Sequence, residues 1–373
     1  MFKSKFACEL KNFDPSEFFD RKELRKYDPF SQYALVSVDQ AIIDSKLDLE
    51  YINKDRVGVI WGSGNGGIQT FQDQMMEFCN GDGTPRFTPF FIPRILVDIA
   101  AGLISIKYGF RGVNFCPVSA CATSSTAIIE AFNYIKWNKA DLFVTGGSEA
   151  CIFPPGIGGF NAMMALSTRN KEPKTASRPF DKNRDGFVMG EGGGALVLEE
   201  YEHAINRGAN IYAELVGSGL TADAHHITAP HPEGIGAQNV MNQAIKEAGI
   251  EKTSVDYINV HGTSTPLGDI AEIKAIKTLF GNHAYKLNIS STKSMTGHLL
   301  GAAGVVEAIA CIMSVKDDVV PPTINHETYD PDIDKKLDLT LNKSKKRKVN
   351  YALSNTFGFG GHNASLLVKK YQR

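Results

Sequence analysis

The sequence predicts an α/β fold made of two similar halves. Short apolar segments alternate with helical patterns along the 373-residue chain, which is typical of buried sheets covered by helices on both faces. A strand–turn–helix pattern also occurs twice, because aligning Cys121 with His298 places 128–131 (Ile-Ile-Glu-Ala) on 305–308 (Val-Val-Glu-Ala). Such a duplication would bring two reactive side chains to the starts of two related helices.

Each expected element follows from its own pattern. Short apolar runs next to turns predict strands at residues 57–61, 141–147, 194–198, 211–216, 255–260 and 350–354. Helical periodicity predicts helices at residues 32–44, 125–137, 236–248, 268–279 and 299–315. A charged helix at 199–207 ends before a new strand, so we expect two domains, 1–209 and 210–373.

The glycine-rich run at residues 62–67 follows the first expected strand. It lacks the Lys-Ser/Thr ending of a P-loop and the spacing of a dinucleotide-binding loop. We therefore interpret these glycines as backbone crowding near a cleft.

Composition excludes several classes of protein. A 43% hydrophobic content can fill a large core, and a net charge of −1 gives no global attraction to nucleic acid or a membrane. The longest nearly apolar segment, 299–313, contains Glu307 and is too short to span a bilayer. The start shows no signal peptide, and the six cysteines lack disulfide-framework spacing, so we expect reduced thiols and a cytoplasmic enzyme.

Cys121 is the first candidate for covalent chemistry. It comes directly before an expected helix, where the helix dipole should lower the pKa of a thiol and favour thiolate. Small neighbours at 120, 122 and 124 leave room for a substrate. A buried structural cysteine is the alternative interpretation of the same pattern.

Two histidines and one lysine are candidates in the second half. His261 follows an expected strand and precedes a loop rich in hydroxyls and glycine, a position that faces the cleft in α/β folds. His298 begins a strongly apolar helix, and Lys293 lies in the same turn. A single histidine is usually a structural residue, but two in glycine-rich turns together with a candidate nucleophile favour catalysis.

The last motif, 354–363, contains Phe357, Phe359 and three glycines. Consecutive backbone N–H groups in such a turn can bind an oxyanion. A tight turn between two strands would explain the same glycines without any catalytic role.

Together these motifs resemble the β-ketoacyl-acyl-carrier-protein synthases, most closely the bacterial type II elongating enzyme. The resemblance is collinear and covers nearly the whole chain, and its motifs are residues 118–123, 165–170, 177–187, 260–269, 291–304 and 355–361. It implies the thiolase fold, a duplicated five-layer αβαβα body, in a homodimer.

The resemblance also implies a role for each site residue. Cys121 matches the nucleophile, and His261 and His298 match the pair that promotes decarboxylation. The remaining matches are the supporting charges Lys293 and Glu307, the pantetheine-binding hydroxyls Thr263 and Thr265, the oxyanion-hole amides of Cys121 and Phe359, and the Phe359 gate. Phe357 is expected to bind substrate as well.

The implied reaction joins an acyl group on Cys121 to malonyl-acyl-carrier-protein, with loss of carbon dioxide. No redox step occurs, so the resemblance implies no cofactor or metal, and 4′-phosphopantetheine arrives on the carrier. The acidic carrier should meet a basic patch, for which Lys22, Arg25 and Lys26 match the family's position. The more basic segment 343–348 is expected to be a surface loop without nucleic acid.

Two departures from the family pattern bear on this chain. The strand of the form Val-Val-Val-Thr-Gly-x-Gly that opens the family is not found, so a core strand is expected to be missing. Its absence would leave an unpaired sheet edge. Asn65 stands where the long-chain type has an apolar residue at the floor of the acyl pocket, which predicts a buried amide and a preference for short or polar acyl groups.

Related classes differ from this chain at single positions. A thiolase would have a second catalytic cysteine where His298 stands, and the initiating synthases would have Asn there. An inactive chain-length partner would lack Cys121. A ketosynthase subunit of a polyketide or aryl-polyene pathway shares every motif and stays open, as does an inactive truncated form.

Overall fold

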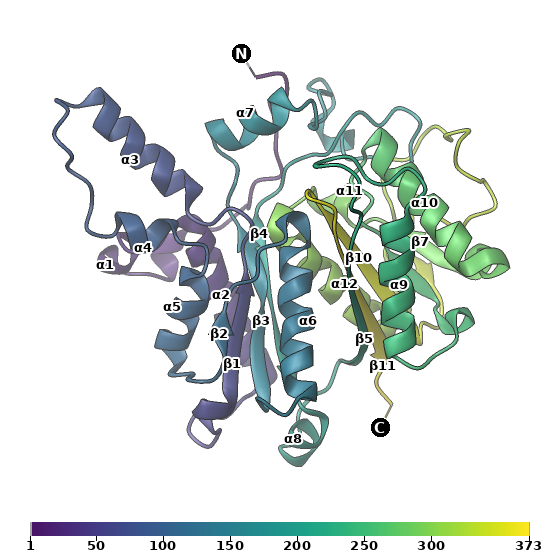
Figure 1. Ribbon diagram of the computed structural model, residues 1–373, viewed down its shortest axis with the longest axis horizontal. Helices are drawn as coiled ribbons and strands as arrows, with labels where there is room; N and C mark the ends of the chain where they lie inside the picture. The colour runs from purple at the N-terminus through teal and green to yellow at the C-terminus, as the bar shows by residue number, and fades with distance from the viewer. Residues whose placement is uncertain (1, 373) are drawn as a thin grey trace.

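The computed structural model describes residues 2–372 as two βα halves packed side by side (Figure 1). The first sheet contains β1 (Val57–Gly62), β2 (Asn114–Phe115), β3 (Leu142–Glu149) and β4 (Gly192–Glu199), in the order β2-β1-β3-β4. The second contains β5 (Ala213–Ala222), β6 (Tyr257–Asn259), β7 (Asn288–Ser290), β10 (Tyr351–Gly358) and β11 (His362–Lys370), in the order β5-β11-β10-β6-β7. All six residues of β1 and all eight of β3 are buried, as expected for strands covered on both faces.

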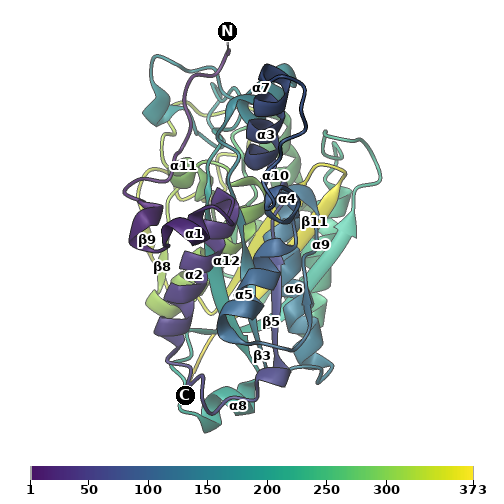
Figure 2. The same cartoon turned by 90° about the vertical axis from the view of Figure 1, so that its left-hand side faces the viewer.

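Helices form three layers around these two sheets. The outer layer on the first sheet consists of α2 (Pro29–Ser45) and α5 (Ile99–Tyr108), and the outer layer on the second consists of α9 (Ile235–Glu247) and α10 (Pro266–Phe280). Between the sheets lie α6 (Thr123–Lys136) and α12 (Ala303–Asp317), whose apolar side chains share one core cluster. From left to right in Figure 1 the order is therefore helix, sheet, helix, sheet, helix, and the expected five-layer architecture is confirmed. Figure 2 looks onto the outer layer that contains α2 and α5.

Short helices and a small sheet complete the chain. The helices are α1 (Arg21–Leu24), α3 (Ile68–Asn80), α4 (Phe91–Ile95), α7 (Pro154–Ala162), α8 (Tyr201–Asn206) and α11 (Lys293–Thr296). The sheet pairs β8 (Val319–Val320) with β9 (Lys345–Lys346), so part of the basic segment expected to be a loop is a strand. Its charges are offset locally, because Lys345 pairs with Asp338 and Arg347 pairs with Asp256.

The two halves repeat one connectivity, with one exception. In each sheet, a central parallel pair (β1 with β3, β6 with β10) is flanked by a parallel strand (β2, β7) and an antiparallel one (β4, β11). The second sheet continues with β5, which pairs antiparallel to β11. Within residues 2–372, β4 has no such neighbour, so one edge of the first sheet is open.

The sequence alignment of the duplicated turns had the wrong register. Short 3₁₀ turns precede the two central helices at Ala120–Ala122 and Leu300–Ala302, and Ala120 and Leu300 share a left-handed backbone with φ of 50° and 49°. Gly301, and not His298, is therefore the structural counterpart of Cys121. The apolar match at 128–131 misled the alignment, because apolar residues recur at several spacings along any buried helix.

Contacts between the central helices follow the corrected register. Ser124 Oγ accepts a hydrogen bond from Val305 N at 3.0 Å, and Gly304 lies so close to Ser125 that a Cβ at Gly304 would be 2.1 Å from its hydroxyl. The starts of the two central helices are therefore in direct contact, which places the Cys121 turn beside the second half.

No helix within residues 2–372 is long and apolar enough to cross a membrane. The six cysteines, all within this range, are free.

Candidate active site

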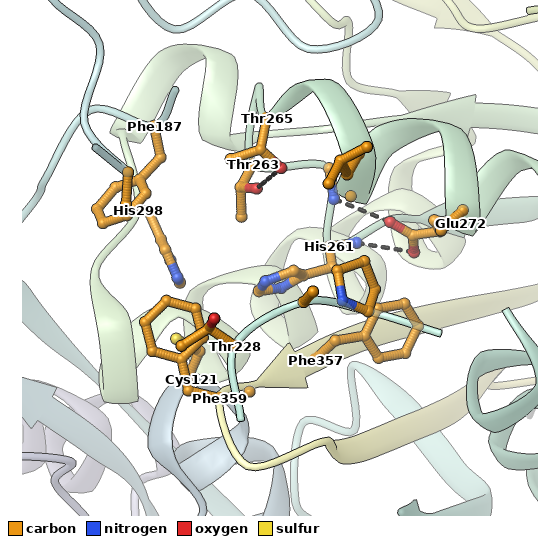
Figure 3. Close-up of a pocket in the computed structure, with 18 of the residues that line it drawn as sticks. Cys121, Phe187, Thr228, His261, Thr263, Thr265, Glu272, His298, Phe357 and Phe359 are labelled. Atoms are coloured by element: carbon orange, nitrogen blue, oxygen red, sulfur yellow. Dashed lines mark hydrogen bonds between the residues drawn. The ribbon is translucent and has the colours of Figure 1, made fainter. Parts of the chain in front are cut away.

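A cavity of about 420 Å³ opens at the junction of the two halves, where the turns after several strands meet. Cys121 from the first half and His261 and His298 from the second lie on its wall, and their side chains point into one space (Figure 3). The lining also includes Thr263, Thr265, Phe357 and Phe359. The structure therefore brings together seven of the residues that the sequence indicated.

Cys121 is held in the 3₁₀ turn just ahead of α6 and is 9% exposed. Burial raises the pKa of its thiol to about 12; nearby Lys293 and the backbone N–H groups of Phe359 and Cys121 lower this pKa by less. The expectation of a thiolate stabilised by the helix dipole is therefore wrong for this resting structure, because desolvation outweighs it. The proton must leave Cys121 as the substrate is attacked.

The same two backbone N–H groups define an oxyanion site. Both lie within hydrogen-bonding reach of the Cys121 sulfur, and they come from the start of the 3₁₀ turn and from the loop between β10 and β11. Gly358 allows this approach, because a Cβ there would be 2.6 Å from the Ser119 carbonyl and 3.1 Å from Cys121 N. An oxygen that develops charge on a carbon bound to Cys121 would face these donors.

The imidazoles of His261 and His298 are nearly perpendicular, with ring centroids 5.2 Å apart. The edge of Phe187 packs against His298 at 5.2 Å, and Phe357 lies 5.7 Å from His261. Burial and the positive charge of Lys293 hold the pKa of both histidines well below 6.5. Both rings are therefore neutral near pH 7, and the Nδ1 atom of each is buried with no protein partner.

Lys293 and Glu307 form a buried ion pair behind the histidines. Their side chains are each 2% exposed, and Lys293 Nζ donates to Glu307 Oε1. Burial raises the pKa of Glu307 to about 7, while Lys293 and a hydrogen bond from Thr356 Oγ1 oppose this shift. Neither residue lines the cavity, and the charge of Lys293 acts on both histidines by lowering their pKa.

Glu272 is a site residue that the sequence reasoning missed. It lies on α10 and accepts hydrogen bonds from the backbone N–H groups of His261 and Gly262, both at 2.9 Å, and from Asn355 Nδ2 at 3.2 Å (Figure 3). Burial raises its pKa to about 7. An acidic residue on the apolar face of a predicted helix was the available signal, because such a position is costly without buried donors.

Glu149 is a second missed carboxylate and joins the two halves. It is fully buried at the end of β3 and accepts hydrogen bonds from Gly64 N (2.9 Å), Asn65 N (3.1 Å), Gly301 N (3.0 Å) and Ser63 Oγ (3.2 Å). A Cβ at Gly64 would be 2.8 Å from its carboxylate, which confirms that this glycine run reflects backbone crowding near the cleft.

The structure does not bring Asn65 into the cavity. Its backbone is fixed by Glu149, but its side chain is exposed and absent from the cavity wall. The expected burial of this amide at the pocket floor is therefore not found in the single chain that the structure describes. The preference for short or polar acyl groups stays a prediction. The apolar side chains that line the cavity include Phe160, Phe187 and Leu300.

The remaining predicted residues fall into two places. Thr263 and Thr265 share a hydrogen bond of 3.0 Å between their hydroxyl oxygens on the cavity wall. Lys22, Arg25 and Lys26 are exposed on and just after α1, outside the cavity wall, and their role in carrier docking stays a prediction.

Comparisons with known proteins indicate the same family along the whole chain. Residues 3–204 match the model of the beta-ketoacyl synthase N-terminal domain, and residues 212–327 match that of its C-terminal domain. The chain is 49% identical to the 3-oxoacyl-[acyl-carrier-protein] synthase 2 of Synechocystis sp., over 99% of this chain and 88% of that protein. It is 51% identical to the protein of the same name from Staphylococcus aureus (strain COL), over 98% and 87%.

Solved structures agree with this assignment. A β-ketoacyl synthase from Burkholderia phymatum superposes with a TM-score of 0.92 at 35% identity, covering 100% of this chain and 90% of that one. A type II PKS ketosynthase solved with its acyl-carrier protein gives 0.90 at 33% identity, covering 100% and 89%. From its architecture, its cysteine–histidine–histidine cavity and its similarity along the whole chain, this protein belongs to the β-ketoacyl synthase family.

Proposed function

We propose that this protein is a 3-oxoacyl-acyl-carrier-protein synthase that elongates fatty acyl chains by decarboxylative condensation. The observation that carries the proposal is the single cavity in which Cys121, two neutral histidines and two converging backbone N–H groups meet. The identity of 49–51% to relatives named 3-oxoacyl-[acyl-carrier-protein] synthase 2 supports the fatty acid pathway over a polyketide pathway, since the type II PKS ketosynthase is 33% identical.

In the first half-reaction, Cys121 Sγ attacks the carbonyl carbon of an acyl thioester carried on pantetheine. A neutral imidazole accepts the thiol proton, since burial keeps that proton on sulfur until attack. The carbonyl oxygen becomes negative opposite the N–H groups of Cys121 and Phe359. When the tetrahedral intermediate collapses, the C–S bond to pantetheine breaks, the proton passes to the leaving thiolate, and the acyl group stays on Cys121.

In the second half-reaction, the malonyl thioester enters along Thr263 and Thr265. Neutral His261 and His298 donate hydrogen bonds to its thioester oxygen, which stabilises the enolate formed as carbon dioxide leaves. The enolate carbon attacks the acyl carbonyl on Cys121, so a C–C bond forms and the bond to Cys121 sulfur breaks. The sulfur takes up a proton, and the 3-oxoacyl product departs on the carrier.

Every electron pair in this cycle comes from the substrates and Cys121, so we propose that no resident cofactor is needed and that pantetheine arrives on the carrier. We also propose that the protein works in the cytoplasm.

We further propose that two copies associate through α3 and α4, which project from the body in Figure 1. Their apolar side chains are unusually exposed, with Phe71 at 47%, Met76 at 55% and Ile92 at 57%. Such a patch favours a protein interface. Sedimentation of Phe71→Glu and Ile92→Glu variants should show monomers where the parent is a dimer; a monomeric parent would contradict the proposal.

The condensation is tested with purified acyl-carrier and malonyl-carrier. Mass spectrometry of a digest should find the acyl group on Cys121, and Cys121→Ser should lose acylation by several orders of magnitude, because a hydroxyl is a far weaker nucleophile. Acyl mass on Cys116 or Cys151 instead would overturn the assignment. A product one C2 unit longer supports fatty acid elongation, whereas repeated condensation without reduction would support a polyketide pathway.

A further inference from the structure

The mouth of the cavity has an unusual apolar rim. Met164 and Leu267 both line the cavity and remain 77% and 69% exposed, and Met163 beside them is 45% exposed. A side chain can satisfy both conditions only where the cavity meets solvent. Met163 and Met164 follow α7, and Leu267 lies in the first turn of α10, so apolar side chains face the opening from two elements.

Met164 is also placed where local energetics favour another residue. It has φ of +55° in the turn that ends α7, where Met164 N donates to Asn161 O and Ala165 N donates to Phe160 O, both at 3.1 Å. This hydrogen-bond pattern ends a helix most favourably with glycine at the left-handed position. A methionine that is both strained and exposed adds nothing to the stability of this turn, which indicates that its side chain serves a contact with something else.

The opposite side of the mouth is held rigidly. Arg184, which is nearly buried, donates to the carbonyl oxygens of Thr265 and Pro266 at 3.2 and 2.9 Å and pairs with Asp330 at 2.5 Å. Leu267 directly follows these residues and is presented to solvent from a fixed turn. A pre-positioned apolar side chain loses little conformational freedom when a partner covers it.

We propose that Met163, Met164 and Leu267 form the apolar centre of the docking surface for the acyl carrier protein. This inference rests on the proposed function. The thioester of the acyl carrier protein must pass this opening to reach Cys121. The carrier must therefore lie over the rim while its pantetheine arm is inserted. A solved ketosynthase that resembles this chain was obtained in complex with its acyl-carrier protein. Exposed apolar side chains at the centre of an interface commonly dominate its affinity.

The proposal differs from docking on charge alone. The predicted basic patch Lys22, Arg25 and Lys26 lies outside the cavity wall, on a helix of the first half. Charges of that kind mainly change the rate of encounter and its dependence on salt. The apolar rim instead sets how long the carrier stays, so its loss should raise KM at every ionic strength.

The test compares a carrier-bound thioester with a carrier-free one. Met164→Gln and Leu267→Gln remove apolar surface without adding charge, and Met164→Leu restores it. Each Gln variant should raise KM for acyl-carrier about tenfold, since burial of one such side chain contributes roughly one to two powers of ten in affinity. Acylation of Cys121 by acyl-pantetheine, which has no carrier protein, should stay within about twofold of the parent by the same reasoning. Met164→Leu should behave as the parent.

Ile43→Gln is the matched control, because Ile43 is also 77% exposed but lies on α2, outside the cavity wall. It should leave KM for acyl-carrier unchanged. An unchanged KM in both rim variants would overturn the proposal, as would equal damage to the carrier-free reaction or a changed oligomeric state in the rim variants. Failure of the parent to become acylated by either thioester would instead contradict the proposed function itself.

Discussion

At the residue scale, the decisive property of this site is that its histidines are neutral and its thiol is protonated. His298 and His261 face one cavity at perpendicular orientation, so they can donate to a single thioester oxygen from two directions. Cys121 lies beside a different set of donors, the backbone N–H groups of Phe359 and Cys121 itself. The two half-reactions therefore depend on different groups.

This division predicts the effect of His298→Ala. Decarboxylation of malonyl-carrier should fall about 10²–10³-fold, the usual loss when one transition-state donor is removed. Acylation of Cys121 should be much less affected, because His261 remains as a proton acceptor and both backbone donors remain. Carbon dioxide release and acyl-enzyme formation are measured separately. Decarboxylation at the parental rate would show that the paired histidines do not stabilise the enolate.

The lowered pKa of both histidines also predicts a pH profile. Each ring stays neutral until the pH falls below its lowered pKa, so the rate of decarboxylation should hold steady as the pH is lowered through 6.5. The rate of decarboxylation should fall only at a lower pH, where the histidines become protonated. Carbon dioxide release by a Cys121→Ala variant isolates this step from acylation. A fall in rate centred at pH 6.5 that persists in both Glu272→Gln and Glu307→Gln would mean that the rings are solvated and titrate as ordinary histidines. A fall that disappears in one of these variants belongs to that carboxyl, whose pKa is about 7.

At the scale of elements, the carboxylate of Glu272 connects α10 to the loop that carries His261. It receives two backbone N–H groups at 2.9 Å, and a glutamine side chain could accept only one of them with its oxygen while its amide group faces the other.

Glu272→Gln should therefore destabilise the fold by about 1–3 kcal/mol, the usual loss for an unsatisfied buried group. It should also slow decarboxylation more than acylation, because His261 alone is displaced. Thermal unfolding and the two half-reaction rates check this, with Glu233→Gln on the exposed surface as a control. An equal loss in both half-reactions would indicate general damage to the fold instead of a role in positioning His261.

The two turns that precede the central helices correspond in a different register from the one that the sequence predicted. The sequence correctly indicated two related turns, each ahead of a buried helix. It aligned Cys121 with His298, whereas the backbone aligns Cys121 with Gly301. Ala120 and Leu300 both have positive φ, and nothing in the side chains of these residues favours it.

At the scale of the whole molecule, the open edge of β4 is the main difference between the halves. The equivalent strand β11 is buried from Asn363 to Val368, whereas Ala195 to Leu198 on β4 are only half-buried. On α12, Val306 and Ile309 are also partly exposed, and Met313 is 37% exposed. An unpaired apolar edge is a site for adding a strand.

An extended peptide should therefore bind β4 antiparallel and stabilise the protein. The suitable probe carries Val-Val-Val-Thr-Gly, the opening strand that the family resemblance implies, with terminal lysines for solubility. At a concentration one hundred times its Kd, such a ligand adds about 2.7 kcal/mol of stability, which calorimetry detects as a raised Tm. A peptide with Pro at its centre should have no effect, because Pro cannot donate to the ladder. Equal Tm shifts from both peptides would contradict specific pairing.

The sequence by itself predicted the layered α/β architecture and two related turns, and it indicated Cys121, His261 and His298, which the structure brings into one cavity. These follow from local patterns, since hydrophobic periodicity sets strands and helices, and glycine-rich turns place polar residues at their ends. The helices α3 and α5 and the final strand β11 were not anticipated, because their patterns are ambiguous in isolation.

Only the tertiary structure decided the electrostatics of the site and the hydrogen-bond partners of its residues. The raised pKa of Cys121, the exposure of Asn65, and the convergence of Glu149 and Glu272 on backbone donors depend on what other segments bury or leave in water. Desolvation and long-range hydrogen bonds act between residues far apart in the chain, so no local pattern encodes them.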